Sequence, residues 1–370
     1  MKLRVYVAFL GLLVVSAASG LAPSATAAVA AKPHVALQQL FDGYGDSGKG
    51  STWTGGAPVQ SVSLPDGRTA WSFATTYLGT VAKNKSRDAA TPTVHSSWVI
   101  QAKGNGKLTT TVLGAGNTDF YPSPVPGAFY EPAGAVVENG KLYQLLWLTA
   151  DVNNPVRIDV ATISLPSFTL EGITTTKFLD THSVQTSAQL YPTVWGGAVV
   201  QDSTYTYVYG TENTYADFAN FAHVARIPRG QFATGTPEYW SGSGWDATTP
   251  LTSARIFGGT TLGGVHLTGS NGAGGLRLVA QGYGVGTSAY DVMMWTAKQP
   301  QGPYKSTFVY TIKKEPGDNG CCALAYYPME VPQYETGPSS LVVGYLDDGG
   351  TDHTSNVRLY RPRFVNGTIG

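Results

Sequence analysis

Three observations in the sequence predict an all-β fold. Runs typical of β-strands recur along the chain, bounded by Gly, Pro, Asn and Asp, and no segment shows a sustained helical apolar period. Charged residues make up only 13% of the chain, and 45 of its 370 residues are glycine, as expected for many tight turns. The strongest strand-like runs are evenly spaced: Thr69–Phe73, Leu142–Leu148, Tyr205–Tyr209, Leu276–Gln281 and Leu341–Tyr345.

The spacing of these runs predicts the architecture. Successive runs start 63 to 73 residues apart, room for about four strands with their loops, and five such units fill residues 34–370. One four-stranded sheet cannot bury both of its faces, but five sheets arranged radially cover one another. The sequence therefore predicts a single domain, a five-bladed β-propeller of roughly four-stranded blades. A pair of β-sandwiches is the competing arrangement, but no linker rich in Pro, Ser or charge divides the chain.

The sequence also predicts particular strands and one tight turn along the chain. His34–Phe41 is expected to add a strand to the last blade, which would join the two ends of the chain and remove a free sheet edge. The turn Pro65-Asp66-Gly67 predicts a hairpin that ends in Thr69–Phe73. In the third unit Trp195–Val200 leads to the strand at Tyr205, and Tyr360–Val365 reads as the closing strand.

Residues 1–27 have the organisation of a secretory signal peptide. Lys2 and Arg4 precede an apolar run, Val5–Val15, that is too short to span a bilayer. Ala25-Thr26-Ala27 offers a cleavage site, and Ala28-Val29-Ala30 offers a second one. A buried N-terminal helix is the alternative. We therefore expect an extracellular, secreted protein without membrane insertion.

Charge and cysteine content narrow the function classes. The chain has 24 basic and 24 acidic residues, and loss of the signal peptide leaves 22 and 24. This balance gives no electrostatic case for binding nucleic acid or an anionic membrane. The only cysteines, Cys321 and Cys322, are adjacent, so they form either a strained vicinal ring or two buried thiols.

The first unit resembles a known family. Thr52-Trp53-Thr54-Gly55-Gly56 and Ala74–Gly79 are similar to the opening blade of secreted bacterial five-bladed β-propellers that include endo-D-arabinan hydrolases. The third and fifth units resemble the same family, and the resemblance covers most of residues 40–365. It implies a glycan ligand and a funnel that holds a pair of acids.

At both expected acid positions this chain departs from the family pattern. The matching residues are Ala57 and Thr75, which neither hold a charge nor pass a proton at neutral pH. The fifth unit carries Tyr327-Pro328-Met329 where family members often have a His-Pro-Glu-like step. Glycoside hydrolysis needs one protonated acid and one carboxylate, so the resemblance implies a scaffold without its usual chemistry.

Other acids and several aromatic residues are candidates for the site. Relocated carboxylates would come from Glu131, Glu330 or Asp46. The alternative role of Glu131 and Glu330 is a salt bridge or hydrogen bond, and that of Asp46 is an Asx-type turn. Aromatic rings at a funnel mouth would stack on sugars, with packing between blades as the alternative role. The candidates for sugar stacking are Trp53, Tyr130, Tyr191, Trp195 and Tyr327.

No cofactor is implied by the sequence. The six histidines show no metal-binding spacing, and no G-x-S-x-G motif marks a serine nucleophile. The acidic loop with Asp347, Asp348, Asp352 and His353 lacks the order of a known calcium loop, so a solvated hairpin is expected there, with a structural Ca²⁺ site as the alternative.

These observations favour an exported carbohydrate-binding propeller, monomeric and with little or no catalytic activity, whose partner is a polysaccharide or cell-wall glycan. The alternative is an active glycoside hydrolase of arabinan type that uses relocated carboxylates. A third alternative is a protein-interaction propeller, since propellers host many functions.

Overall fold

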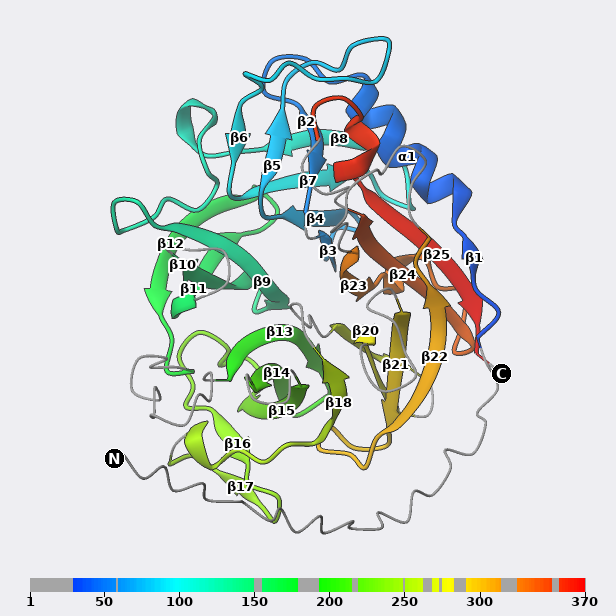
Figure 1. The fold of residues 1–370 in the computed structure, drawn as a ribbon. Coiled ribbons are helices and arrows are strands. Elements are labelled where there is room, and N and C mark those ends of the chain that lie inside the picture. The colour runs from blue at the N-terminus through cyan, green and yellow to red at the C-terminus, as the bar shows by residue number, and fades with distance from the viewer. Residues whose placement is uncertain are drawn as a thin grey trace, which may run out of the picture.

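The computed structural model of the chain describes residues 29–57, 59–149, 155–178, 193–214, 219–248, 250–261, 268–272, 275–282, 291–313, 325–347 and 353–369. Its strands form antiparallel sheets that stand side by side around a common centre (Figure 1). The all-β expectation is therefore confirmed, and the radial arrangement is that of a β-propeller. The competing arrangement, a pair of β-sandwiches, is not what these sheets form.

Consecutive strands build each of the larger sheets. The first sheet contains β3 (Val59–Ser63), β4 (Thr69–Phe73), β7 (Ser97–Gln101) and β8 (Leu108–Val112). The second contains β9 (Phe129–Glu138), β10 (Lys141–Thr149), β11 (Pro155–Ser164) and β12 (Thr169–Thr175). The third contains β13 (Val194–Gln201), β14 (Tyr205–Thr214), β15 (Ala219–Pro228), β16 (Glu238–Trp240) and β17 (Trp245–Asp246), with β18 (Phe257–Thr261) paired to β15.

The remaining sheets complete the ring. The fourth contains β19 (Thr268–Gly272), β20 (Gly275–Gly282), β21 (Asp291–Ala297) and β22 (Lys305–Thr311). The last contains β23 (Ala325–Glu330), β24 (Ser340–Asp347), β25 (Pro362–Thr368) and the N-terminal β1 (Lys32–Pro33). A small extra sheet is made of β2 (Trp53–Gly56), β5 (Thr76–Leu78) and β6 (Thr93–Val94). Short 3-10 helices occupy Ala115–Asn117, Pro250–Thr252, Pro332–Tyr334 and Val357–Tyr360.

The evenly spaced runs in the sequence turn out to occupy equivalent places. Each of them lies in the second strand of a sheet: β4, β10, β14, β20 and β24. The first strands of the sheets contact one another in a closed cycle, from β3 through β9, β13, β19 and β23 back to β3. The first strands therefore line the centre, and the residues at their beginnings share one end of it.

The core lies between neighbouring sheets rather than in one central layer. Buried apolar residues form clusters, and each cluster joins two adjacent sheets. Pairs that span the successive interfaces are Trp98 with Leu146, Ile158 with Trp195, Tyr209 with Leu278, Val292 with Val343, and Val342 with Trp71. Fully burying one such side chain contributes about 1.5–3 kcal/mol, so each sheet depends on both neighbours.

The predicted hairpin of the first sheet is confirmed. Ser63 pairs with Thr69 across the turn, and Gly67 has a φ of 86°, a conformation that favours glycine. The Asp66 carboxylate accepts a hydrogen bond from the backbone N–H of Arg68 at 3.0 Å. Asp66 therefore has the turn role that its neighbours in the sequence suggest.

The expectation that His34–Phe41 forms a strand is wrong. Residues Val35–Asp46 form the helix α1, which begins after His34, whose Nδ1 accepts a hydrogen bond from the backbone N–H of Leu37. Its apolar side chains, at positions 37, 40, 41 and 44, follow a helical spacing and face the body of the protein. The strand that closes the last sheet is instead β1, where Lys32 pairs with Asn366 and Pro33 with Val365.

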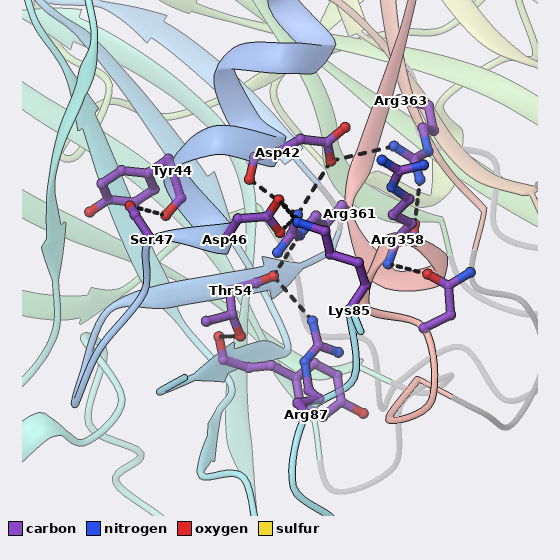
Figure 2. A network of polar contacts seen from close by, with 12 residues as sticks. Asp42, Tyr44, Asp46, Ser47, Thr54, Lys85, Arg87, Arg358, Arg361 and Arg363 are labelled. Carbon is purple, nitrogen blue, oxygen red and sulfur yellow. Dashed lines mark hydrogen bonds and ion pairs between the residues drawn. The ribbon is translucent and has the colours of Figure 1, made fainter. Parts of the chain in front are cut away.

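A polar network joins α1 to the end of the chain (Figure 2). Arg361 lies immediately before β25, is fully buried, and donates from Nε to the carbonyl oxygen of Thr54 at 2.8 Å. Its Nη1 lies 3.0 Å from an Asp46 oxygen and 3.4 Å from an Asp42 oxygen. Gly45 permits this approach, because a Cβ there would lie 2.7 Å from Nη2 of Arg361. The network therefore fixes both ends of the chain to the small extra sheet.

Candidate functional site

The candidate site lies where the first strand of the second sheet begins. Phe129 and Glu131 point to one side of β9 and Tyr130 to the other, because successive side chains of a strand alternate. Across the sheet, Glu131 pairs with Trp147 of β10, and the indole N–H of Trp147 donates to the carbonyl oxygen of Trp195 at 2.8 Å. Glu131 thus lies beside the third sheet as well as in the second.

Glu131 has an unusual electrostatic environment. Burial raises the pKa of its carboxyl to about 7, and the nearby His95 only partly opposes that shift. Within the ranges that the structure describes, this carboxyl has no hydrogen-bond or ion-pair partner. A carboxyl in this state holds and releases a proton near neutral pH, which is what a general acid must do.

An aromatic platform lies beside Glu131. The His95 ring stacks on Phe129, with ring centroids 4.1 Å apart and planes at 19°. Asp119 fixes His95, because its Oδ1 accepts from the His95 backbone N–H at 2.6 Å and its Oδ2 lies 3.4 Å from Nδ1. The His95 side chain remains 44% exposed, so part of the platform faces solvent. Phe129, His95 and Asp119 were not among the residues predicted from the sequence, although Phe129 precedes Tyr130-Glu131 in the same short segment.

Tyr130 faces away from this platform. It is 1% exposed, and its hydroxyl donates to the Oδ2 atom of Asp159. Arg157 holds the same Asp159 oxygen from Nε at 3.0 Å and from Nη2 at 2.7 Å. Burial, with the Asp159 carboxylate as a second cause, raises the pKa of Tyr130 to about 12. Tyr130 therefore presents no ring face to a ligand and anchors β9 to β11 instead.

The two expected acid positions do come together. The backbone N–H of Ala57 donates to the carbonyl oxygen of Thr75 at 3.1 Å, and Ala57 is 4% exposed. The fold thus juxtaposes the two positions, but both side chains lack an ionisable group. Their side chains supply neither a proton nor a negative charge.

Glu330 and Asp46 are both held by cations. The Glu330 side chain is fully buried at the end of β23, with Oε1 2.7 Å from Nη2 of Arg277, and it lines a central cavity of about 70 Å³. Asp46 is the last residue of α1 and pairs with Lys85 and Arg361. Burial opposes ionisation of Asp46, but these partners hold its pKa below the ordinary value. Asp46 is thus part of an ion-pair network, and no Asx-type turn is formed there.

The remaining aromatic candidates divide into buried and undescribed residues. Trp53 and Trp195 are fully buried and contact other core rings, so the structure places them in the alternative, packing role. Tyr191 lies outside the described residues, and of Tyr327 only the backbone, in β23, is described. The expected signal peptide at residues 1–27, Cys321, Cys322, Asp348 and Asp352 also lie outside the described ranges.

The raised pKa of Glu131 predicts a pH dependence of stability. An unfolded chain loses this proton near 4.5, whereas the folded protein keeps it to about 7. The native state therefore binds more protons in that window, and its contribution to stability is lost as the pH rises through it. We expect the free energy of unfolding of the wild type to fall relative to Glu131→Gln between about pH 4.5 and 7. Urea unfolding across this range measures the difference, and a difference that does not change with pH contradicts the prediction.

Among the described residues no three His, Cys, Asp or Glu side chains gather closely enough to hold a metal ion. In the same ranges, none of the helices has the length and apolar character that a bilayer crossing requires.

Solved structures share the fold. A protein from Bacteroides ovatus described as a "putative hydrolase" is 20% identical, with a TM-score of 0.70 over 91% of this chain and 90% of that one. A GH43_1 enzyme from Xanthomonas citri complexed with xylotriose has a TM-score of 0.47 and 14% identity, over 89% and 92% of the chains. The native arabinanase of Bacillus subtilis has a TM-score of 0.40 and 10% identity, over 84% and 92%. The last two likenesses are too weak to carry an argument about function.

Family membership follows from the sequence itself. None of the curated proteins compared with the chain matches it. The family model described as "Domain of unknown function (DUF5005)" matches residues 38–367, which is most of the chain. The chain therefore belongs to the DUF5005 family.

Proposed function

We propose that this chain is an exported, five-bladed, monomeric propeller that binds a polysaccharide or cell-wall glycan and hydrolyses it weakly or not at all. The observation that carries the proposal is the contact between Ala57 and Thr75. The fold brings these two positions together, while their side chains cannot exchange protons. The sequence resemblance to propellers that act on arabinan gives the ligand class.

The surface beside Glu131 supports glycan binding. Sugar rings bind on flat aromatic faces with polar groups at their edges. The stacked pair of Phe129 and His95 offers such a face, and Asp119 and Glu131 offer oxygen atoms next to it. All four residues lie at or near the start of β9, the first strand of the second sheet.

A second candidate, an active glycoside hydrolase, is favoured by one observation. Glu131 has a pKa of about 7 and no ion-pair partner in the described ranges, which suits a general acid. Hydrolysis also needs an ionised carboxylate across the sugar, about 5 to 9.5 Å away. Glu330 and Asp46 are committed to Arg277 and to Lys85 with Arg361, so neither is available in the structure as described. The geometry therefore favours binding over turnover.

One experiment tests both candidates. The processed protein is titrated with arabinan, xylan and galactan by calorimetry, and released reducing ends are measured in parallel. Phe129→Ala is expected to weaken binding about tenfold, or about 1.4 kcal/mol, because a stacking face is lost. Phe308→Ala, which removes a 39% exposed ring from β22, is the matched control and should leave affinity unchanged.

The same titration can contradict the proposal of glycan binding. Unchanged affinity in Phe129→Ala, or no binding to any of the glycans, contradicts the binding surface. Rapid release of sugars that Glu131→Gln reduces by about 100-fold or more would establish the hydrolase instead.

A further inference from the structure

A second polar constellation lies on the neighbouring sheet, and no part of the glycan proposal uses it. Nδ1 of His223 lies 2.9 Å from Oγ of Ser253, and Nε2 lies 2.9 Å from Oε2 of Glu212. Glu212 belongs to β14 and His223 to β15, where they are diagonal neighbours on one face of the sheet: Glu212 pairs with Phe221, and His223 with Gly210. Ser253 follows the short helix Pro250–Thr252.

Two backbone bonds fix Ser253 against this face. The N–H of Ala254 donates to the carbonyl oxygen of Trp240 at 2.7 Å, and that of Ile256 donates to Ala222 at 2.9 Å. Glu212 is therefore positioned by its strand, and Ser253 by backbone hydrogen bonds to the same sheet. The His223 ring also lies 6.3 Å from that of Trp195, so the constellation is close to the start of the first strand of its sheet.

The hydrogen-bond chemistry assigns the protons. A carboxylate only accepts hydrogen bonds, so Nε2 of His223 carries a proton and donates a hydrogen bond to Glu212. In a neutral imidazole this leaves Nδ1 as the acceptor of the Ser253 hydroxyl. His223 is thereby oriented as a general base toward a serine oxygen, which is the relation that a nucleophile system requires.

Arg255 keeps Glu212 in the form that this assignment needs. Its Nε and Nη2 donate to the two Glu212 oxygens at 2.8 and 2.7 Å. Burial alone would raise the pKa of Glu212, but the hydrogen bonds from Arg255 and His223 lower it to about 2. Glu212 therefore stays ionised at every pH at which an enzyme of this kind would work.

His223, Glu212 and Ser253 differ in solvent exposure in the way that catalysis by a serine nucleophile requires. His223 is 4% exposed and Glu212 is mostly buried, so water does not compete for their mutual hydrogen bond. Ser253 is partly exposed, and Leu251, two residues before it, is 60% exposed. The Ser253 hydroxyl thus borders solvent, where a substrate can reach it.

We propose that Ser253, His223 and Glu212 form a serine nucleophile system that cleaves carboxylic esters. The Ser253 oxygen bonds to the ester carbonyl carbon, and its proton moves to Nδ1 of His223. As the ester C–O bond breaks, His223 gives that proton to the departing alcohol, which leaves an acyl group on Ser253. Water then attacks this group with help from His223, the proton returns to Ser253, and a carboxylic acid is released. Glu212 is a positioning residue that stabilises the imidazolium.

The test uses a fluorophosphonate probe, which reacts with activated serines, and p-nitrophenyl acetate as the ester. We expect the full-length protein to be labelled at Ser253, as peptide mass mapping identifies, and to hydrolyse the acetate. Ser253→Ala should abolish both activities without shifting the thermal unfolding midpoint. Ser241→Ala is the matched control, since Ser241 is a partly buried serine of the same sheet region whose hydroxyl donates to the backbone oxygen of Gly244.

Glu212→Gln separates a catalytic arrangement from a merely structural one. It should lower kcat for the ester by about 100- to 10,000-fold with little change in KM, because substrate contacts are untouched while the proton on Nε2 is no longer fixed. Absence of labelling in the wild type, or labelling that survives in Ser253→Ala, overturns the proposal. The result does not depend on glycan binding, so either proposal can fail alone.

Discussion

Replacing Arg361 by methionine is expected to lower the free energy of unfolding by about 3 kcal/mol, the lower end of the range for breaking a buried ion pair. The Arg361 side chain is 1% exposed, and its loss removes one of two arginine partners from Asp42 and one of two cationic partners from Asp46, while Arg363 and Lys85 remain. It also removes the donor to the carbonyl oxygen of Thr54, which leaves Arg87 Nη2 as the remaining side-chain donor to that oxygen, at 3.1 Å. Urea unfolding followed by tryptophan fluorescence measures the change.

Arg358 provides the control for this experiment. It belongs to the same short segment and appears in the same network view, but its side chain is exposed (Figure 2). Arg358→Met should change the free energy of unfolding by less than about 0.5 kcal/mol, as surface substitutions usually do. Equal losses from both substitutions would mean that the Arg361 contacts do not hold the two ends together.

Replacing Phe41 by alanine should lower the free energy of unfolding by about 3–5 kcal/mol, because a fully buried ring leaves a cavity that its neighbours cannot fill. Phe41 belongs to α1 and is 0% exposed. Its ring centroid lies 5.0 Å from that of Trp71, 5.7 Å from that of Trp53 and 5.2 Å from that of Phe364. One side chain thus connects the helix with the first sheet, the small extra sheet and the last sheet.

Val35→Ala is the comparison for Phe41→Ala. Val35 begins the same helix and is 59% exposed, so its truncation should cost less than about 0.5 kcal/mol. Urea unfolding of both variants measures the difference. A small effect of Phe41→Ala would show that α1 is an appendage rather than a part of the core.

The sequence predicted the sheets better than it predicted the ends of the chain. Strand-like runs recur at equivalent places because each sheet must bury a similar second strand between its neighbours. The helix α1 was missed because its core-facing apolar residues span only Leu37 to Tyr44 and glycines interrupt the pattern at positions 43 and 45. These glycines reduce helix propensity, but burial of Phe41 and the contact of Gly45 with Arg361 override it.

The candidate sites show a different limit. Tyr130 was a candidate for sugar stacking and Glu131 a candidate carboxylate, yet alternation along β9 sends Tyr130 to Asp159 and leaves Phe129 on the side of Glu131. Glu212, His223 and Ser253 were missed because no local motif connects them. Only the pairing of β14 with β15 and the return of the chain after β17 bring them within hydrogen-bond distance.

The pairing of β1 with β25 also sets the order in which the molecule can be completed. During synthesis Lys32 and Pro33 leave the ribosome more than 300 residues before their partners Asn366 and Val365. The final sheet must therefore wait for the whole polypeptide, and any fragment that stops short leaves an unpaired edge at each end. A protease that removed Lys32 and Pro33 from the finished protein would expose the same edge of β25, and an unpaired strand edge can pair with other chains.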